Sequence, residues 1–108
     1  MREIKAIIRP DRLSDVVHAL REIPHMPGVT VSVVQGFGHV ERTHGTEPFG
    51  EAQFAKIETV VSVGLVKQVI EAIQRAAHAG RSGDGKIFVL SVDNVTRIST
   101  GEEGEEAI

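Results

Sequence analysis

The sequence predicts an α+β fold of the ferredoxin-like kind, in which the order βαββαβ builds one split sheet with two helices on one face. Each half of the sequence contains a strand-like stretch, then a stretch with the apolar spacing of a helix, then a second strand-like stretch. A long polar segment separates the two β-α-β halves, and right-handed crossovers bring their strands into one sheet. A length of 108 residues suits a single two-layer core, so residues 1–108 are expected to form one domain.

The first half of the chain begins with a strand over residues 2–8, whose alternating apolar residues are Ile4, Ala6 and Ile8. Pro10 ends this strand because proline has no N–H to give to a sheet. A helix follows, with one apolar stripe at Leu13, Val16, Val17 and Leu20. Pro24 and Pro27-Gly28 end the helix and lead into a β-branched strand over residues 29–34.

The segment that joins the two halves begins with two glycines around Phe37, a pattern that indicates a bulge or a close approach of the backbone. From His39 to Gln53 the chain is polar and shows no periodicity. This stretch predicts a loop of about 15 residues, which is long for a compact domain and is therefore expected to be functional or disordered.

The second half repeats the first. A strand is predicted over residues 54–63, and Gly64 ends it. The second helix carries an apolar stripe at Leu65, Val66, Val69, Ile70, Ile73 and Ala77, and Gly80 ends it. A strand over residues 87–92 and a short last strand over 95–99 complete the sheet. An acidic tail follows, whose glutamates we expect to be solvated.

The face of the sheet away from the helices also carries apolar residues, namely Ile7, Val34 and Val60. Apolar surface of this extent is normally covered, and association with further copies of the chain is the simplest way to cover it. The sequence therefore predicts an oligomer.

Composition excludes several classes of protein. A net charge of −3 and the absence of Trp and Tyr argue against nucleic-acid binding. Without Cys there is no disulfide, thiol catalysis or thiolate metal site. The sequence shows no apolar run near the ~20 residues needed to span a bilayer and no signal-peptide pattern, so a soluble cytoplasmic protein is expected.

Gly83-Asp84-Gly85-Lys86, which runs directly into the apolar stretch 87–90, is the main candidate binding motif. Glycines allow a ligand to approach the backbone closely, and successive N–H groups in such a turn can cradle an anion beside the lysine. The same residues also form ordinary turns before strands, so both interpretations stay open on this motif alone.

With these elements in place, the chain resembles the PII family of signal-transduction proteins nearly from end to end. The resemblance is carried by the opening strand up to Pro10, by Gly28-Val29-Thr30-Val31 with Gly36-Phe37-Gly38, by Lys56-Ile57-Glu58, by Gly83-Asp84-Gly85-Lys86-Ile87-Phe88-Val89, by Arg97-Ile98-Ser99-Thr100-Gly101-Glu102 and by Glu105-Glu106-Ala107-Ile108. The family's T-loop would cover about residues 38–54, its B-loop about 80–86, and its C-loop and tail about 94–108.

The resemblance implies a homotrimer that binds ADP or ATP in the clefts between subunits and acts through its T-loop on a target such as a membrane transporter or its regulator. The phosphates would be bound by Gly83, Asp84, Gly85 and Lys86, with Arg97 as a further cation. Thr30 and Val60 would lie at the adenine end. The backbone of Gly38, His39 and Val40 would close the site.

Three departures from the family pattern bear on the ligand. Val40 replaces a glutamine that helps to bind Mg²⁺ and 2-oxoglutarate, and Phe54 replaces a lysine that pairs with the 2-oxoglutarate carboxylate. The 2-oxoglutarate site is therefore expected to be lost. Ser99 replaces a second arginine at the phosphates, so ATP should lose more affinity than ADP or AMP. The T-loop also contains no tyrosine to be uridylylated.

Bicarbonate is one candidate for a second effector. It could bind on the backbone of Gly36, Phe37 and Gly38, next to His39 or Arg42.

Two alternatives remain. His39, Glu41 and His44 offer possible metal ligands, although loop histidines at irregular spacing are more often solvated. The stretch 34–38 with Arg42 is similar to the phosphate loop of acylphosphatases, but it follows the second strand instead of the first. The sequence shows no nucleophile–base pair, so no enzyme is expected.

Overall fold

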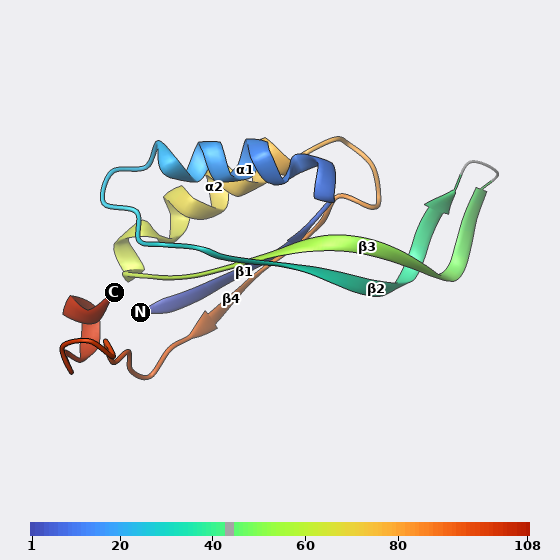
Figure 1. Ribbon diagram of the computed structural model, residues 1–108. Helices are drawn as coiled ribbons and strands as arrows, with labels where there is room; N and C mark the ends of the chain where they lie inside the picture. Colours follow the sequence, from blue (N-terminus) through green and yellow to red (C-terminus); the bar gives the residue numbers. More distant parts are fainter. Residues whose placement is uncertain (43–44) are drawn as a thin grey trace.

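Two helices cover one face of a four-stranded antiparallel sheet in the computed structural model of the chain (Figure 1). The structure describes residues 1–42 and 45–108, and the side chains of residues 1–38 and 50–108. The sheet order is β2-β3-β1-β4, so the fold is the predicted ferredoxin-like α+β fold. The elements are β1 (Arg2–Ile8), α1 (Leu13–Arg21), β2 (Thr30–Arg42), β3 (Gly45–Val61), α2 (Val66–Ala77) and β4 (Gly85–Ser91). Short 3₁₀ turns are η1 (Pro10–Arg12), η2 (Val63–Leu65) and η3 (Gly104–Ala107).

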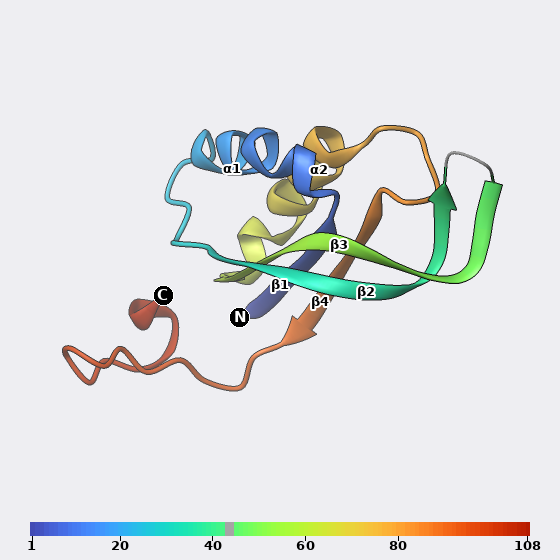
Figure 2. The same ribbon diagram turned by 45° about the vertical axis from the view of Figure 1, so that its right-hand side comes forward.

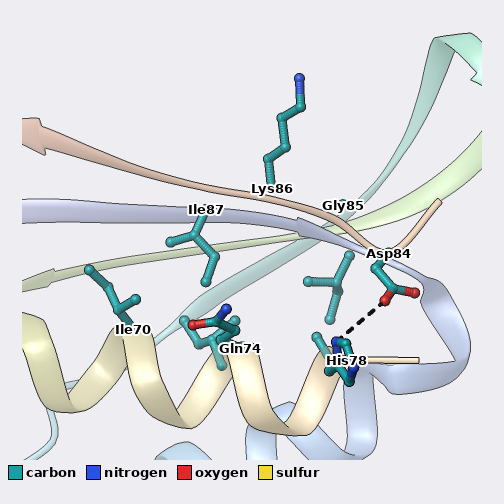
Figure 3. Close-up of a pocket in the computed structure, with 10 residues that line it drawn as sticks. Ile70, Gln74, His78, Asp84, Gly85, Lys86 and Ile87 are labelled. Atoms are coloured by element: carbon teal, nitrogen blue, oxygen red, sulfur yellow. Dashed lines mark ion pairs between the residues drawn. The ribbon is translucent and has the colours of Figure 1, made fainter. Parts of the chain in front are cut away.

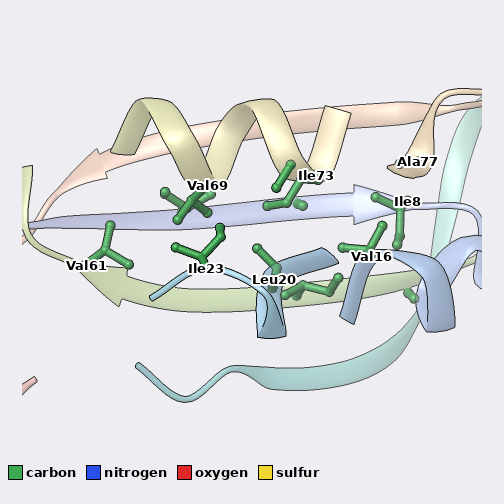
Figure 4. Packing of buried hydrophobic residues seen from close by; sticks show 13 residues of the cluster. Ile8, Val16, Leu20, Ile23, Val61, Val69, Ile73 and Ala77 are labelled. Carbon is green, nitrogen blue, oxygen red and sulfur yellow. The ribbon is translucent and has the colours of Figure 1, made fainter. Parts of the chain in front are cut away.

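The hydrophobic core lies between the helices and the sheet (Figure 4). Every second residue of β1 is buried there, as the alternation in the sequence predicted. The two helices contribute their apolar stripes, of which Val16, Leu20, Val69, Ala72, Ile73 and Ala77 are buried. Each fully buried aliphatic side chain stabilises the fold by about 1.5–3 kcal/mol. This core fixes the strand register and therefore the positions of the loops at the strand ends.

The irregular loop expected from His39 to Gln53 was wrong, because most of these residues belong to β2 and β3. Both strands continue past the sheet as a two-stranded ribbon, with Gly36 paired to Ala52 and Val40 to Glu47 (Figures 1 and 2). The register shifts between Gly38 and Val40, which confirms the expected irregularity at the glycines. The ribbon extends beyond the helices, so it has no covered face that would impose alternation on its sequence.

The C-terminal segment corrects a second expectation. Residues 95–99 do not form a strand, and the region holds a single isolated bridge between Thr96 and Glu103. The segment folds on itself, because the N–H of Arg97 donates to the Glu102 carbonyl at 2.8 Å and that of Gly104 to the Val95 carbonyl at 2.9 Å. It follows the end of β4, on the side of the sheet where β1 begins (Figure 2).

The second face of the sheet has no helix over it (Figure 1). Its apolar residues are partly or well exposed, with Phe88 and Leu90 of β4 at 46% and 41%. Two strand-wise ion pairs lie among them, Lys5–Glu3 at 3.6 Å and Lys56–Glu58 at 3.5 Å. We call this surface the open face, defined by the outward residues Glu3, Lys5, Ile7, Thr30, Ser32, Val34, Phe54, Lys56, Glu58, Val60, Lys86, Phe88 and Leu90.

Candidate anion-binding site

The turn between α2 and β4 is organised by the carboxylate of Asp84. Its Oδ2 accepts hydrogen bonds from the N–H groups of Ala79 at 2.8 Å, Gly80 at 2.9 Å and Arg81 at 3.3 Å. The pKa of Asp84 lies well below its usual range, mainly because of the Ala79 N–H, with further lowering from Arg9, Gly80 and Arg81 against an opposing effect of burial. Asp84 is therefore ionised at neutral pH, and its oxygens are engaged by the protein itself.

Gly85 shows why this turn needs glycine. Its φ of +105° is a left-handed conformation that side chains rarely adopt. A Cβ at this position would overlap the main-chain oxygen of Ile7 on the adjacent strand β1. The turn can thus approach β1 closely only because residue 85 has no side chain.

Lys86 extends from the open face, on the opposite side of β4 from α2 and Asp84 (Figure 3). It is exposed and has no ion-pair partner among the residues that the structure describes. A pocket of about 270 Å³ lies beside it, lined by Ile7, Phe54, Ser82, Gly83, Gly85, Lys86 and Phe88. A free cation above a glycine turn is the arrangement that binds a small anionic group.

A second groove lies on the helix side of β4 and has a volume of about 390 Å³ (Figure 3). Its walls are mostly apolar side chains of α2 and β4, among them Ile70, Ile73 and Ile87. His78 lies at one end, with Nδ1 3.9 Å from Oδ2 of Asp84. The apolar lining suits side chains better than phosphates.

Phe54 and Gly36 meet on the open face at the base of the ribbon. A Cβ at Gly36 would come within 2.8 Å of Cε2 of the Phe54 ring, so the ring lies directly on the glycine. The predicted close approach at the glycines is thereby explained. Gly36, Phe37 and Gly38 all lie in β2, and successive N–H groups of an extended strand point to opposite sides. In this conformation they do not form the concave cradle expected for bicarbonate.

The remaining predicted site residues lie far from Lys86 within one chain. Thr30 pairs with Glu58 and is level with Phe88, but it lies on the other edge strand, β2. Val60 pairs with Glu3, toward the end of the sheet where β4 stops. The C-terminal segment, which contains Arg97 and Ser99, lies beyond that end (Figures 1 and 2). The seven residues of β4 alone span about 20 Å at about 3.3 Å per residue. Within one chain, Lys86 and the C-terminal segment with Arg97 and Ser99 are therefore separated by the length of β4.

Several predicted residues cannot be placed by their side chains. The backbones of His39, Val40, Glu41 and Arg42 belong to β2, but their side chains lie outside the described part, as does His44 altogether. Elsewhere in the described chain no three potential ligands come together to hold a metal ion. The stretch 34–38 is a strand and not a loop between the first strand and helix, so its likeness to an acylphosphatase phosphate loop lacks the required context.

Sequence reasoning missed Arg9. Its Nε donates to Oδ1 of Asp84 at 3.1 Å, which joins the end of β1 to a turn 75 residues later in the chain. A basic residue before a proline carries no local pattern that indicates such a contact.

Comparison with known proteins identifies the class that this fold and turn define. The model of the family "Nitrogen regulatory protein P-II" matches residues 1–102, and the chain belongs to this family. The chain is 47% identical to the nitrogen regulatory protein P-II of Azospirillum brasilense and 45% identical to that of Rhodospirillum rubrum. Both comparisons cover the whole of both proteins over 115 aligned positions.

Among solved structures, the chain is similar to Arabidopsis thaliana PII bound to citrate. The TM-score is 0.83 and the sequence identity 42%, over 99% of this chain and 91% of the other. The family assignment agrees with the resemblance seen in the sequence. None of the described helices is long and apolar enough to cross a membrane.

Proposed function

We propose that this protein is a cytoplasmic, trimeric signalling protein that binds ADP or ATP in clefts between subunits and is not an enzyme. The observation that carries the proposal is the glycine turn with Lys86, which pairs with no carboxylate of the described residues, beside a pocket. Polyphosphates bind where N–H groups and cations converge. The citrate in the solved Arabidopsis PII is likewise a compact polyanion, which supports anion binding on this fold.

The separation of Lys86 from Arg97 supports a site shared between two copies. Lys86 and the glycine turn lie where β4 starts, and the C-terminal segment that contains Arg97 and Ser99 lies beyond the end where β4 stops (Figure 1). A phosphate chain is too short to reach both within one protomer. A neighbouring subunit that places its C-terminal segment against the turn completes the site, with Thr30 and Val60 at the adenine end.

The two sheet edges support a closed ring. β2 and β4 are the edge strands, and the helix side of β2 exposes Val31 and Val33, the latter at 67%. On the helix side of β4, a groove of about 480 Å³ is lined by apolar residues that include Val66, Ile70 and Val89. If β2 of one copy paired with β4 of the next, Val31 and Val33 of the first copy would pack into this groove of the second. Such a head-to-tail contact closes into a ring when the rotation allows.

The position of Ser99 sets the preference among nucleotides. The family's second arginine at the phosphates is absent here, and an ion contact of that kind contributes about 1.5–3 kcal/mol. ATP is therefore expected to bind with little more affinity than ADP. Phe54 packs on Gly36 beside the turn. Its aromatic ring occupies the position at which the family has a lysine that pairs with 2-oxoglutarate. That dicarboxylate is accordingly not an effector.

Bicarbonate bound beside ADP at Gly36–Gly38, with His39 or Arg42, is the second effector that we propose. It requires the base of the ribbon to leave its extended conformation, because the strand does not present consecutive N–H groups to one side. Nucleotide and anion would then shift the ribbon between conformations. A target such as a membrane transporter, or its regulator, would bind one of these conformations better.

Isothermal titration calorimetry tests the proposal. ATP, ADP, AMP and cyclic AMP are each titrated with and without bicarbonate or 2-oxoglutarate. We expect ADP to bind, ATP to bind no tighter, bicarbonate to alter ADP affinity and 2-oxoglutarate to have no effect. Lys86→Ala should lower ADP affinity with the oligomer intact. Failure of every nucleotide to bind would overturn the proposal, and hydrolysis of ATP or an acyl phosphate would favour an enzyme.

A further inference from the structure

The ion pair between Arg9 and Asp84 lies behind the glycine turn and is not part of the ligand contacts proposed above. Arg9 directly follows β1, an inner strand that pairs with both β3 and β4. Its Nε is 3.1 Å from Oδ1 of Asp84, and the two side chains are only 22% and 20% exposed. An ion pair that is mostly shielded from solvent in this way fixes two segments relative to each other more strongly than a pair on the open surface.

Asp84 transmits this contact to the turn. While Oδ1 accepts from Arg9, Oδ2 accepts from the N–H groups of Ala79 and Gly80, so one carboxylate joins β1 to the residues that leave α2. The side chain of Asp84 faces α2 and His78, whereas Lys86 extends from the other side of β4 (Figure 3). The Asp84 carboxylate therefore supports the turn from behind.

The guanidinium of Arg9 also lies against Gly83. A Cβ at Gly83 would come within 2.7 Å of Nη2 and 3.3 Å of Cζ of Arg9. The guanidinium thus lies beside the Cα of Gly83, in the turn between α2 and β4. Moving or removing this group leaves the backbone of Gly83 without support on that side.

Charge gives the pair a second role. Without Arg9, the negative charge of the Asp84 carboxylate would be less balanced and would repel an anion bound at the turn. Arg9 neutralises Asp84 in place, which leaves the charge of Lys86 available to the ligand.

We propose that Arg9 is a positioning residue of the anion site: through Asp84 and Gly83 it holds the turn in its binding conformation and cancels the negative charge behind it. This inference rests on the proposed nucleotide site. It predicts that the length and charge of residue 9 matter for binding, although the side chain acts through Asp84.

The experiment compares Arg9→Met, Arg9→Lys and a control, Arg12→Met, in the full-length oligomer. Arg12 also pairs with an aspartate, Asp15 at 3.9 Å, but lies at the start of α1. We expect Arg9→Met to lower ADP affinity about tenfold, or about 1.4 kcal/mol. Arg9→Lys, which keeps a cation for Asp84, should restore most of that loss, and Arg12→Met should change nothing.

A second measurement separates positioning from general damage. Amide hydrogen exchange in the absence of nucleotide should accelerate at Ala79, Gly80 and Arg81 in Arg9→Met and stay unchanged at Ile57 in the core. Adding Arg9→Met to Asp84→Asn should cost no further ADP affinity, because both changes remove the same contact. Unchanged exchange in the turn, or wild-type ADP affinity in Arg9→Met, would overturn the role of Arg9. Wild-type protein that binds no ADP would instead overturn the proposed function.

Discussion

The ring of Phe54 lies directly on Gly36, so that a Cβ added to the glycine would come within 2.8 Å of Cε2 of the ring. This contact joins β3 to β2 where the two strands leave the sheet as a ribbon. It also places an aromatic group beside the turn that carries Lys86. The base of the ribbon is therefore coupled by packing to the proposed anion site.

Phe54→Ala is expected to lower the free energy of unfolding by about 1–2 kcal/mol, because the ring is partly buried. Gly36→Ala should destabilise the wild type but cost less in the Phe54→Ala background, where the ring is absent. A double-mutant cycle in urea should give a coupling of at least about 0.5 kcal/mol. Gly38→Ala is the control, since no atom of the described side chains and backbone lies within 4 Å of its added Cβ. Additive effects of the two changes would contradict the contact.

Gly85→Ala should destabilise the protein by about 3 kcal/mol or more, because the new methyl group meets the Ile7 carbonyl and φ is +105°. Gly64→Ala is the matched control. Its Cβ meets nothing within 4 Å, and the change should stabilise slightly by restricting the unfolded chain. Thermal unfolding of both variants checks the expectation, and equal melting temperatures would show that the turn tolerates a side chain.

Asp84 predicts how stability depends on pH. Its pKa is lowered in the folded state, so its contribution is fully present above the unfolded pKa of about 3.9 and is lost as pH falls through the folded value. When the melting temperature of the wild type is measured from pH 7 down to pH 2, it should fall as the pH is lowered. The Asp84→Asn variant should be less stable than the wild type at pH 7, and its melting temperature should fall less in acid. Asp15→Asn, at an exposed position on α1, should follow the wild type.

Leu90→Arg should weaken the oligomer, because Leu90 is 41% exposed on the open face that association is expected to cover. Burying a guanidinium without a partner costs several kcal/mol. Sedimentation velocity should show smaller species for this variant, with an unchanged circular dichroism spectrum. Gln68→Arg, at an exposed position of α2, should sediment as the wild type. An intact oligomer in Leu90→Arg would mean that this face stays open.

The sequence allowed the elements of the core to be predicted because the helices impose a period on them. Ile4, Ala6 and Ile8 alternate since one face of β1 is covered, and Val69 and Ile73 recur on the buried side of α2. The ribbon formed by the far ends of β2 and β3 was not predicted, for the opposite reason. It has no helix over it, so its pairing comes from backbone hydrogen bonds that any polar sequence can make.

The candidate site was predictable only in part. Glycines at 83 and 85 and the lysine at 86 are local, so their pattern is visible in the sequence. The roles of Asp84 and Arg9 are tertiary, because their contact joins segments 75 residues apart. The short strand expected over residues 95–99 was wrong since its apolar residues, such as the fully exposed Ile98, face no core.

Mixed oligomers of two inactive variants test the shared site most directly. In the proposed trimer, Lys86→Ala and Arg97→Ala are each expected to bind ADP poorly on their own. If each site takes Lys86 from one subunit and Arg97 from the next, every mixed trimer contains one intact site. Calorimetry after the two variants are unfolded and refolded together should therefore show ADP binding near wild-type affinity with reduced stoichiometry. Mixtures that bind no better than the separate variants would place both cations in one subunit and contradict the account.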